Sequence, residues 1–207
     1  FINDKSMMVD GRGTYQYKKL VKALSFCKQF RSAIDIGAHV GTWTIHLSKT
    51  FEHVYCFEPM PDHRECWKKN LQEVNRLQKC SLYKYALGND EGNYWITSNI
   101  DSSGDTWIDI FNNQDSNRRR VEVEMLKLDT FEFDNIDLIK IDCEGYELCV
   151  LQGGEETIKV NKPIIVVEQK PGRGEKYGFA RTAACDYLES LGAKRLDIMS
   201  GDYFYGW

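Results

Sequence analysis

Residues 32–42 read S-A-I-D-I-G-A-H-V-G-T, a short apolar run followed by a loop with two glycines. The apolar run is typical of a buried strand, and residues 42–49 are compatible with a helix, so the segment predicts strand, tight turn and helix. The pattern then repeats. Residues 53–57 (H-V-Y-C-F) predict a second buried strand, and residues 61–75 predict the helix after it. Two consecutive strand–helix units indicate an α/β fold with a parallel sheet.

The flanking sequence extends this pattern in both directions. Further helices are predicted over residues 14–30, 145–152 and 184–191. Further strands are predicted over residues 80–87, 94–97, 106–111, 121–128, 136–141, 164–167, 195–199 and 203–207. We expect a single domain with a leading helical segment (1–31), a core (32–168) that contains a β-rich insertion, and a C-terminal lid, helix and strand pair (169–207).

Composition excludes several classes of protein. The chain has 207 residues, 42% of them hydrophobic, and a net charge of −4, which argues against a protein whose main task is to grip nucleic acid. The longest aliphatic run, residues 164–167, is far too short to cross a membrane. The seven cysteines form no C-x-x-C pair, which favours reduced thiols and a cytoplasmic location.

Acidic residues stand where the predicted strands end. Glu58 follows the second strand, Asp142 and Glu144 follow the strand at 136–141, and Glu168 follows the strand at 164–167. Carboxylates are poor strand formers and costly to bury unpaired, and ligands of open α/β sheets bind beyond the carboxyl ends of strands. We therefore expect a functional site at this edge, although solvated strand caps are the simpler alternative.

The loop after the first strand narrows the choice of cofactor. Glu58 lies 21 positions after Gly37, near the spacing of about 20 at which an acidic residue reaches ribose hydroxyls in nucleotide-binding folds. A pyrophosphate-binding loop requires G-x-G-x-x-G, but His39 and Thr42 occupy the second and third glycine positions. S-adenosylmethionine has no phosphate and fits this loop better. A nicotinamide-dependent dehydrogenase is accordingly disfavoured.

Several motifs together resemble the FkbM family of S-adenosylmethionine-dependent methyltransferases. They are A-I-D-I-G-A-H-V-G at 33–41, F-E-P at 57–59, D-L-I-K-I-D-C-E-G-Y-E at 137–147, L-Q-G at 151–153, and the segment from K-P at 162–163 to Glu168. The resemblance implies a seven-stranded, Rossmann-like class I methyltransferase fold and O-methylation of a sugar, a glycan or a secondary-metabolite hydroxyl. His39 stands where the family often has Asn. The insertion and the C-terminal region match loosely, and we expect them to select the acceptor.

These arguments predict two sets of site residues. The cofactor-binding set is Asp35, Gly37, Ala38, His39, Gly41, Thr42, Glu58, Pro59, Ala86 and Asp142, and the catalytic set is Lys140, Asp142 and Glu144. Asp35 could steer the methionine ammonium or hold the loop. Asp142, Glu144 and Glu168 could act as a base or bind a hard metal ion, and we predict no metal site. A non-catalytic binding module would have no use for the catalytic set.

Three further features have two interpretations each. The basic run Arg118–Arg120 is expected to be a solvated surface turn rather than a site for an anionic acceptor or nucleic acid. Residues 170–178, rich in glycine and cations, form either a mobile lid or an ordinary connector. Trp43 is expected in the core rather than against the cofactor.

Overall fold

The structure, a computed structural model, describes residues 8–9, 12–13, 16–99, 106–110 and 118–207. The helices are α1 (Tyr17–Phe26), α2 (Thr42–Thr50), α3 (Pro61–Glu73), α4 (Glu147–Gly153), α5 (Glu155–Asn161) and α6 (Ala183–Ser190), with 3-10 turns η2 (Leu77–Lys79), η3 (Leu128–Phe131) and η4 (Glu175–Tyr177). The strands are β1 (Met8–Val9), β2 (Arg12–Gly13), β3 (Ser32–Ile36), β4 (His53–Phe57), β5 (Cys80–Tyr83), β6 (Ala86–Leu87), β7 (Gly92–Asn99), β8 (Thr106–Ile108), β9 (Arg118–Leu126), β10 (Ile136–Ile141), β11 (Ile164–Glu168), β12 (Lys194–Met199) and β13 (Asp202–Gly206).

Seven strands form the main sheet, in the order β12-β13-β11-β10-β3-β4-β5. The central pairs are parallel, whereas β13 runs antiparallel to both β11 and β12. Strand order therefore reverses between β3 and β10, the position at which open α/β sheets bind ligands. The predicted seven-stranded Rossmann-like sheet with a C-terminal strand pair is confirmed.

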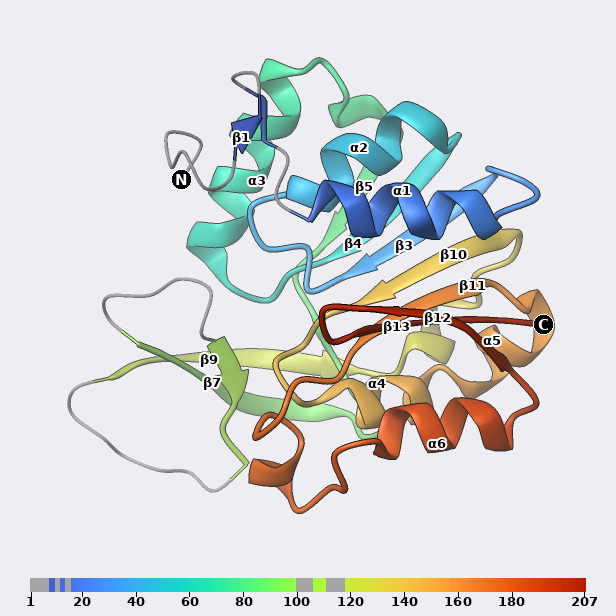
Figure 1. Cartoon of the computed structure of the whole chain (residues 1–207). Coiled ribbons are helices and arrows are strands. Elements are labelled where there is room, and N and C mark those ends of the chain that lie inside the picture. Colours follow the sequence, from blue (N-terminus) through green and yellow to red (C-terminus); the bar gives the residue numbers. More distant parts are fainter. Residues whose placement is uncertain (1–7, 10–11, 14–15, 100–105, 111–117) are drawn as a thin grey trace.

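Helices cover both faces of the main sheet (Figure 1). Successive strand residues point to opposite faces, so Ala33 packs with Leu20 and Trp67 from α1 and α3, whereas Ile34 packs with Val150 and Leu188 from α4 and α6. This two-sided burial explains why the strands read as continuous apolar runs. Among the described residues, no helix is both long and apolar enough to span a bilayer.

A second, four-stranded sheet has the order β6-β9-β7-β8 and forms the β-rich insertion that the sequence predicts. The prediction of one strand over 80–87 is wrong. The chain pairs with β4 only as far as Tyr83 and then crosses to the second sheet, where Ala86 and Leu87 pair with β9. Figure 1 shows this sheet beside the end of the main sheet at which β3 and β10 finish.

Several predicted boundaries change. Helix α1 is shorter than the predicted 14–30, and the prediction at Thr14 lies outside the described residues, as does Phe111 of the strand expected at 106–111. Helix α5 was not predicted; its signal is weak because Ile158 is its only fully buried aliphatic side chain. The run Arg118–Arg120 is not a turn but the first part of strand β9.

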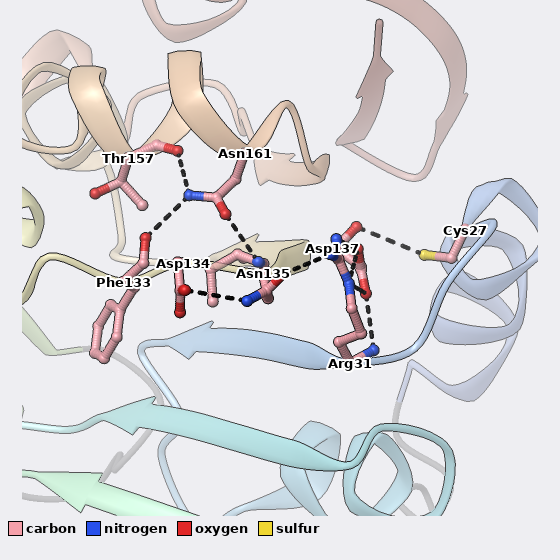
Figure 2. Close-up of polar contacts among 9 residues, drawn as sticks. Cys27, Arg31, Phe133, Asp134, Asn135, Asp137, Thr157 and Asn161 are labelled. Carbon is pink, nitrogen blue, oxygen red and sulfur yellow. Dashed lines mark hydrogen bonds and ion pairs between the residues drawn. The ribbon is translucent and has the colours of Figure 1, made fainter.

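The amino ends of β3 and β10 carry a polar cluster that holds the fold together (Figure 2). Arg31 pairs with Asp137, and Arg31 Nη1 donates to Asn135 Oδ1 at 2.6 Å. Asn161 accepts from the Ile136 amide at 3.0 Å and thereby ties α5 to the start of β10. These partners satisfy one another, so the cluster ties the loops at this end of the main sheet together.

Candidate active site

A cavity of about 390 Å³ opens at the carboxyl ends of β3, β4 and β10, a volume within the range of small-molecule sites. The predicted site residues that line it are Gly37, Ala38, His39, Thr42, Glu58, Pro59, Ala86, Lys140, Asp142 and Glu144. We call the part made by these strand ends and their loops the core wall. The part made by Ile96, Thr106, Trp107 and Ile108 of β7 and β8 is the insertion wall. Asp35 and Gly41 were predicted for the site and do not line the cavity.

The loop after β3 needs glycine at position 37. Gly37 has φ 73°, and a Cβ atom there would lie 2.0 Å from the Asp142 carbonyl oxygen. The amides of Gly37 and Ala38 both donate to the Phe57 carbonyl at 3.0 Å. The loop is therefore clamped between the ends of β4 and β10.

Asp35 and Lys140 form a buried ion pair behind this loop. Lys140 Nζ lies 3.2 Å from Asp35 Oδ1 and donates to the Gly37 carbonyl at 2.8 Å. Asp35 also accepts from Thr44 Oγ1 at 2.7 Å. Burial alone would lower the pKa of Lys140, but Asp35 and Asp142 raise it above its usual value. Lys140 is thus a permanent cation whose partner is Asp35, and the pair supports the loop.

Glu58 is almost completely buried and accepts hydrogen bonds from the loop. Its Oε2 receives the His39 amide at 2.8 Å, and its Oε1 receives the Met60 amide at 2.9 Å and lies 3.2 Å from His63 Nδ1. Burial would raise the pKa of Glu58, but the hydrogen bonds from His63 and Met60 outweigh it and lower the pKa. The carboxylate is ionised at neutral pH.

Three carboxylates meet at the ends of β10 and β11. One oxygen from each of Asp142, Glu144 and Glu168 lies within 4.8 Å of the other two. Arg173 Nη1 is 2.9 Å from Glu144 Oε2, and Lys170 Nζ is 2.5 Å from Glu168 Oε1. Protein cations therefore already neutralise two members of the cluster, which makes it a poor match for a hard metal ion that needs several free oxygen ligands.

The electrostatics of Glu144 differ from those of an ordinary carboxylate. Burial raises the pKa of Glu144 to about 7, Asp142 adds to the shift, and Arg173 opposes it. Burial and Asp142 also raise the pKa of Glu168. A group that titrates near neutrality at the edge of a cavity is suited to proton transfer.

Glu147 holds the segment between β10 and α4. Its Oε1 accepts from the Cys143 amide at 3.0 Å and the Gly145 amide at 2.9 Å. Burial raises the pKa of Glu147 to about 7, although these amides oppose the shift. At Gly145, a Cβ atom would lie 2.2 Å from the Arg173 carbonyl, so the backbones of the two loops touch.

Aromatic and basic side chains support the insertion wall. Arg118 lies 4.7 Å and Lys176 lies 4.9 Å from the centre of the Trp107 ring. Tyr177 donates from its hydroxyl to the Ile108 carbonyl at 3.0 Å and stacks edge-on against Tyr146. Residues 170–178 thus contact both walls, and their opening as a lid stays a prediction.

Cavity residues that were not predicted for the site include Gln16, His63, Trp107 and Tyr146, although Tyr146 stands in the motif at 137–147. Trp43 is buried, as expected of a core residue, but it also lines the cavity and donates from Nε1 to Gln16 Oε1 at 2.7 Å. The second indole, at Trp107, was detectable only as one of five tryptophans. Their shared location depends on tertiary structure, which no local motif encodes.

Solved structures with a similar fold include methyltransferases and a decarboxylase. The precorrin 8w decarboxylase of Methanobacterium thermoautotrophicum has a TM-score of 0.56 and 14% identity, with 100% of this chain and 96% of that chain covered. A Streptococcus mutans protein solved in complex with S-adenosylhomocysteine has a TM-score of 0.54 and 9% identity, with coverages of 91% and 94%. At these identities the likeness concerns the fold alone.

The sequence comparison identifies the protein family, which the fold comparison does not. It matches the Methyltransferase FkbM domain over residues 35–194, and the chain therefore belongs to the FkbM methyltransferase family. The FkbM methyltransferase of Methylobacillus flagellatus has a TM-score of 0.56 and 17% identity over 86% of this chain, which spans only 44% of that protein. No curated protein sequence matches this chain.

Proposed function

We propose that the chain transfers the methyl group of S-adenosylmethionine to a hydroxyl of a sugar, a glycan or a secondary metabolite. Membership of the FkbM family supports methyl transfer. The observation that carries the proposal is a single cavity lined both by Glu58 and by Asp142 and Glu144. Such a cavity can hold a ribose-bearing cofactor beside carboxylates that face an acceptor.

The core wall fits the proposed cofactor. The Glu58 carboxylate is ionised, sits against the loop and is positioned to accept a hydrogen bond from a ribose hydroxyl. The absence of a Cβ atom at Gly37 keeps the loop against Asp142 and the cavity open. His39, Thr42 and Pro59 complete this part of the wall. When bound, S-adenosylmethionine supplies an activated methyl group on a sulfonium.

The protein's own residues must then orient and deprotonate the acceptor. A neutral alcohol is a poor nucleophile, so a carboxylate that accepts its proton assists the transfer. We assign this role to Asp142, which lines the cavity, rather than to its neighbour Glu144, whose carboxylate is paired with Arg173. Lys140 cannot accept a proton while it is charged, and we assign to it and Asp35 the support of the loop.

The experiment is a transfer assay with methyl-labelled S-adenosylmethionine and a panel of sugars, glycans and phenolic or aliphatic hydroxyl metabolites. We expect label in an alkali-stable ether product. Binding of S-adenosylhomocysteine without transfer to any acceptor would favour a non-catalytic module, and binding of NAD in its place would favour a dehydrogenase. The seven reduced cysteines lead us to assign the reaction to the cytoplasm.

A further inference from the structure

Three donors hold the Glu58 carboxylate, and one of them is a side chain. The Met60 and His39 amides come from the backbone, whereas His63 Nδ1 lies 3.2 Å from Oε1. His63 stands in the first turn of α3, is buried and lines the cavity. The His39 ring packs edge-on against it, with 4.4 Å between ring centres.

The Glu58 carboxylate has one acceptor site that these three donors do not use. An ionised carboxylate accepts only, so His63 must carry its hydrogen on Nδ1. The carboxylate offers about four lone-pair sites. The Met60 amide and His63 use those of Oε1, and the His39 amide uses one on Oε2. One site on Oε2 is left for a ligand hydroxyl.

We propose that His63 is a positioning residue for the cofactor, because its bond to Oε1 fixes the rotation of the Glu58 carboxylate so that Oε2 receives a ribose hydroxyl. The inference rests on the proposed function, since it requires a ribose-bearing cofactor in this cavity. It adds a residue that acts through Glu58 and need not touch the cofactor.

Two substitutions distinguish a positioning role for His63 from a purely structural one, because the two roles predict opposite orders of cofactor affinity. His63→Phe keeps a ring of similar size in the buried position but has no donor. His63→Asn loses the ring but keeps an amide N–H close to the place of Nδ1. If His63 acts only through packing, His63→Phe should bind the cofactor better than His63→Asn. If it positions Glu58, His63→Asn should bind the cofactor better than His63→Phe.

The test is calorimetric titration with S-adenosylhomocysteine, for both variants alone and in a Glu58→Gln background. We expect His63→Phe to weaken binding about tenfold or more and His63→Asn to stay within about threefold of the wild type, because a hydrogen bond to a charged group is lost only in the first. In the Glu58→Gln background the two variants should bind alike.

Other outcomes overturn the inference. It fails if His63→Phe binds as the wild type does, if His63→Asn is no better than His63→Phe, or if their difference persists with Glu58→Gln. Thermal unfolding checks that each variant is folded. If His63→Phe does not fold, His63→Leu is used in its place as the variant without a donor. A wild-type protein that does not bind S-adenosylhomocysteine would refute the proposed function itself and the inference with it.

Discussion

The core wall and the insertion wall of the cavity are built in different ways. In the core wall, the loop residues and carboxylates are held by hydrogen bonds within the main sheet, such as those from His39 to Glu58 and from Lys140 to Gly37. In the insertion wall, Trp107 is held by the stacked cations Arg118 and Lys176, which come from two distant segments.

The difference indicates that the two walls have different roles in binding. Hydrogen bonds and ion pairs in the low-dielectric interior are strong and make a network rigid, which suits a cofactor that is the same in every reaction. Cation–π contacts on a half-buried indole are weaker and less directional, which suits a surface that must fit one acceptor among many. We therefore assign the cofactor to the core wall and acceptor choice to the insertion wall.

The largest effect on turnover is expected from substitution of Asp142, the residue to which we assign the proton transfer. Asp142→Asn keeps the shape of the side chain but removes its charge, and we expect turnover to fall about 10²–10⁴-fold while affinity for S-adenosylhomocysteine changes only a few fold. The assay is transfer of labelled methyl under single-turnover conditions. Asp134→Asn, an exposed site just before the same strand, is the control. Normal turnover in Asp142→Asn would mean that the carboxylate cluster is structural.

Glu147 tests how rigidly the core wall is built. The pKa of Glu147 lies near 7 in the folded protein and near 4.5 in the unfolded chain, so the protein loses stability as the pH rises from about 4.5 to 7. Glu147→Gln cannot ionise, and its carbonyl can still accept from the Cys143 and Gly145 amides. We expect it to stabilise the protein by on the order of 2 kcal/mol at pH 8 and by little at pH 4.5.

Thermal and denaturant unfolding at the two pH values measure this difference. The new amide group loses the Gln169 donor, a long contact of 3.4 Å, which offsets part of the gain. A Glu147→Gln protein that is equally destabilised at both pH values would show that the ionised carboxylate is required for the fold.

Trp107 tests the insertion wall separately. Trp107→Ala should raise the KM for the acceptor about tenfold, since it removes a large side chain from the cavity, and should leave S-adenosylhomocysteine affinity unchanged. Trp95→Ala is a matched control, because Trp95 is also stacked by an arginine, Arg120 at 4.7 Å, but does not line the cavity. Equal losses of acceptor and cofactor binding in Trp107→Ala would remove the distinction between the walls.

The smallest effect is expected from removal of metal ions. Arg173 and Lys170 already pair with Glu144 and Glu168, so the cluster of three carboxylates does not depend on a divalent cation for charge balance. Turnover in EDTA should stay within about twofold of the untreated enzyme. Loss of activity that Mg²⁺ or Mn²⁺ restores would assign the three carboxylates to a metal site instead.

The core wall was largely predictable because its determinants are local. The loop at 37–41 follows a buried strand directly, and the spacing to Glu58 is set by one strand–helix unit. Asp35 is a partial exception. Strand alternation puts it on the same face as Ala33, toward α2 and away from the cavity, and its partner Lys140 lies opposite it on β10.

The insertion wall could not be predicted residue by residue. Trp107 reaches the cavity only because β8 pairs with β7 and the second sheet lies across the ends of the first. His63 was missed for a different reason, because its contact with Glu58 is local. A histidine in a helical pattern carries no sign that its ring will meet a carboxylate five positions earlier, and the first turn of α3 alone brings them together.

The central claim, that the core wall binds S-adenosylmethionine through Glu58, is tested most directly by calorimetric titration of S-adenosylhomocysteine into the wild type, Glu58→Ala and Glu52→Ala. Glu52 is exposed and precedes the same strand, β4, at its other end. We predict saturable binding to the wild type and to Glu52→Ala, with Glu58→Ala weaker by about 1.5–3 kcal/mol, or roughly 10- to 150-fold. Unchanged affinity in a folded Glu58→Ala protein would contradict the account.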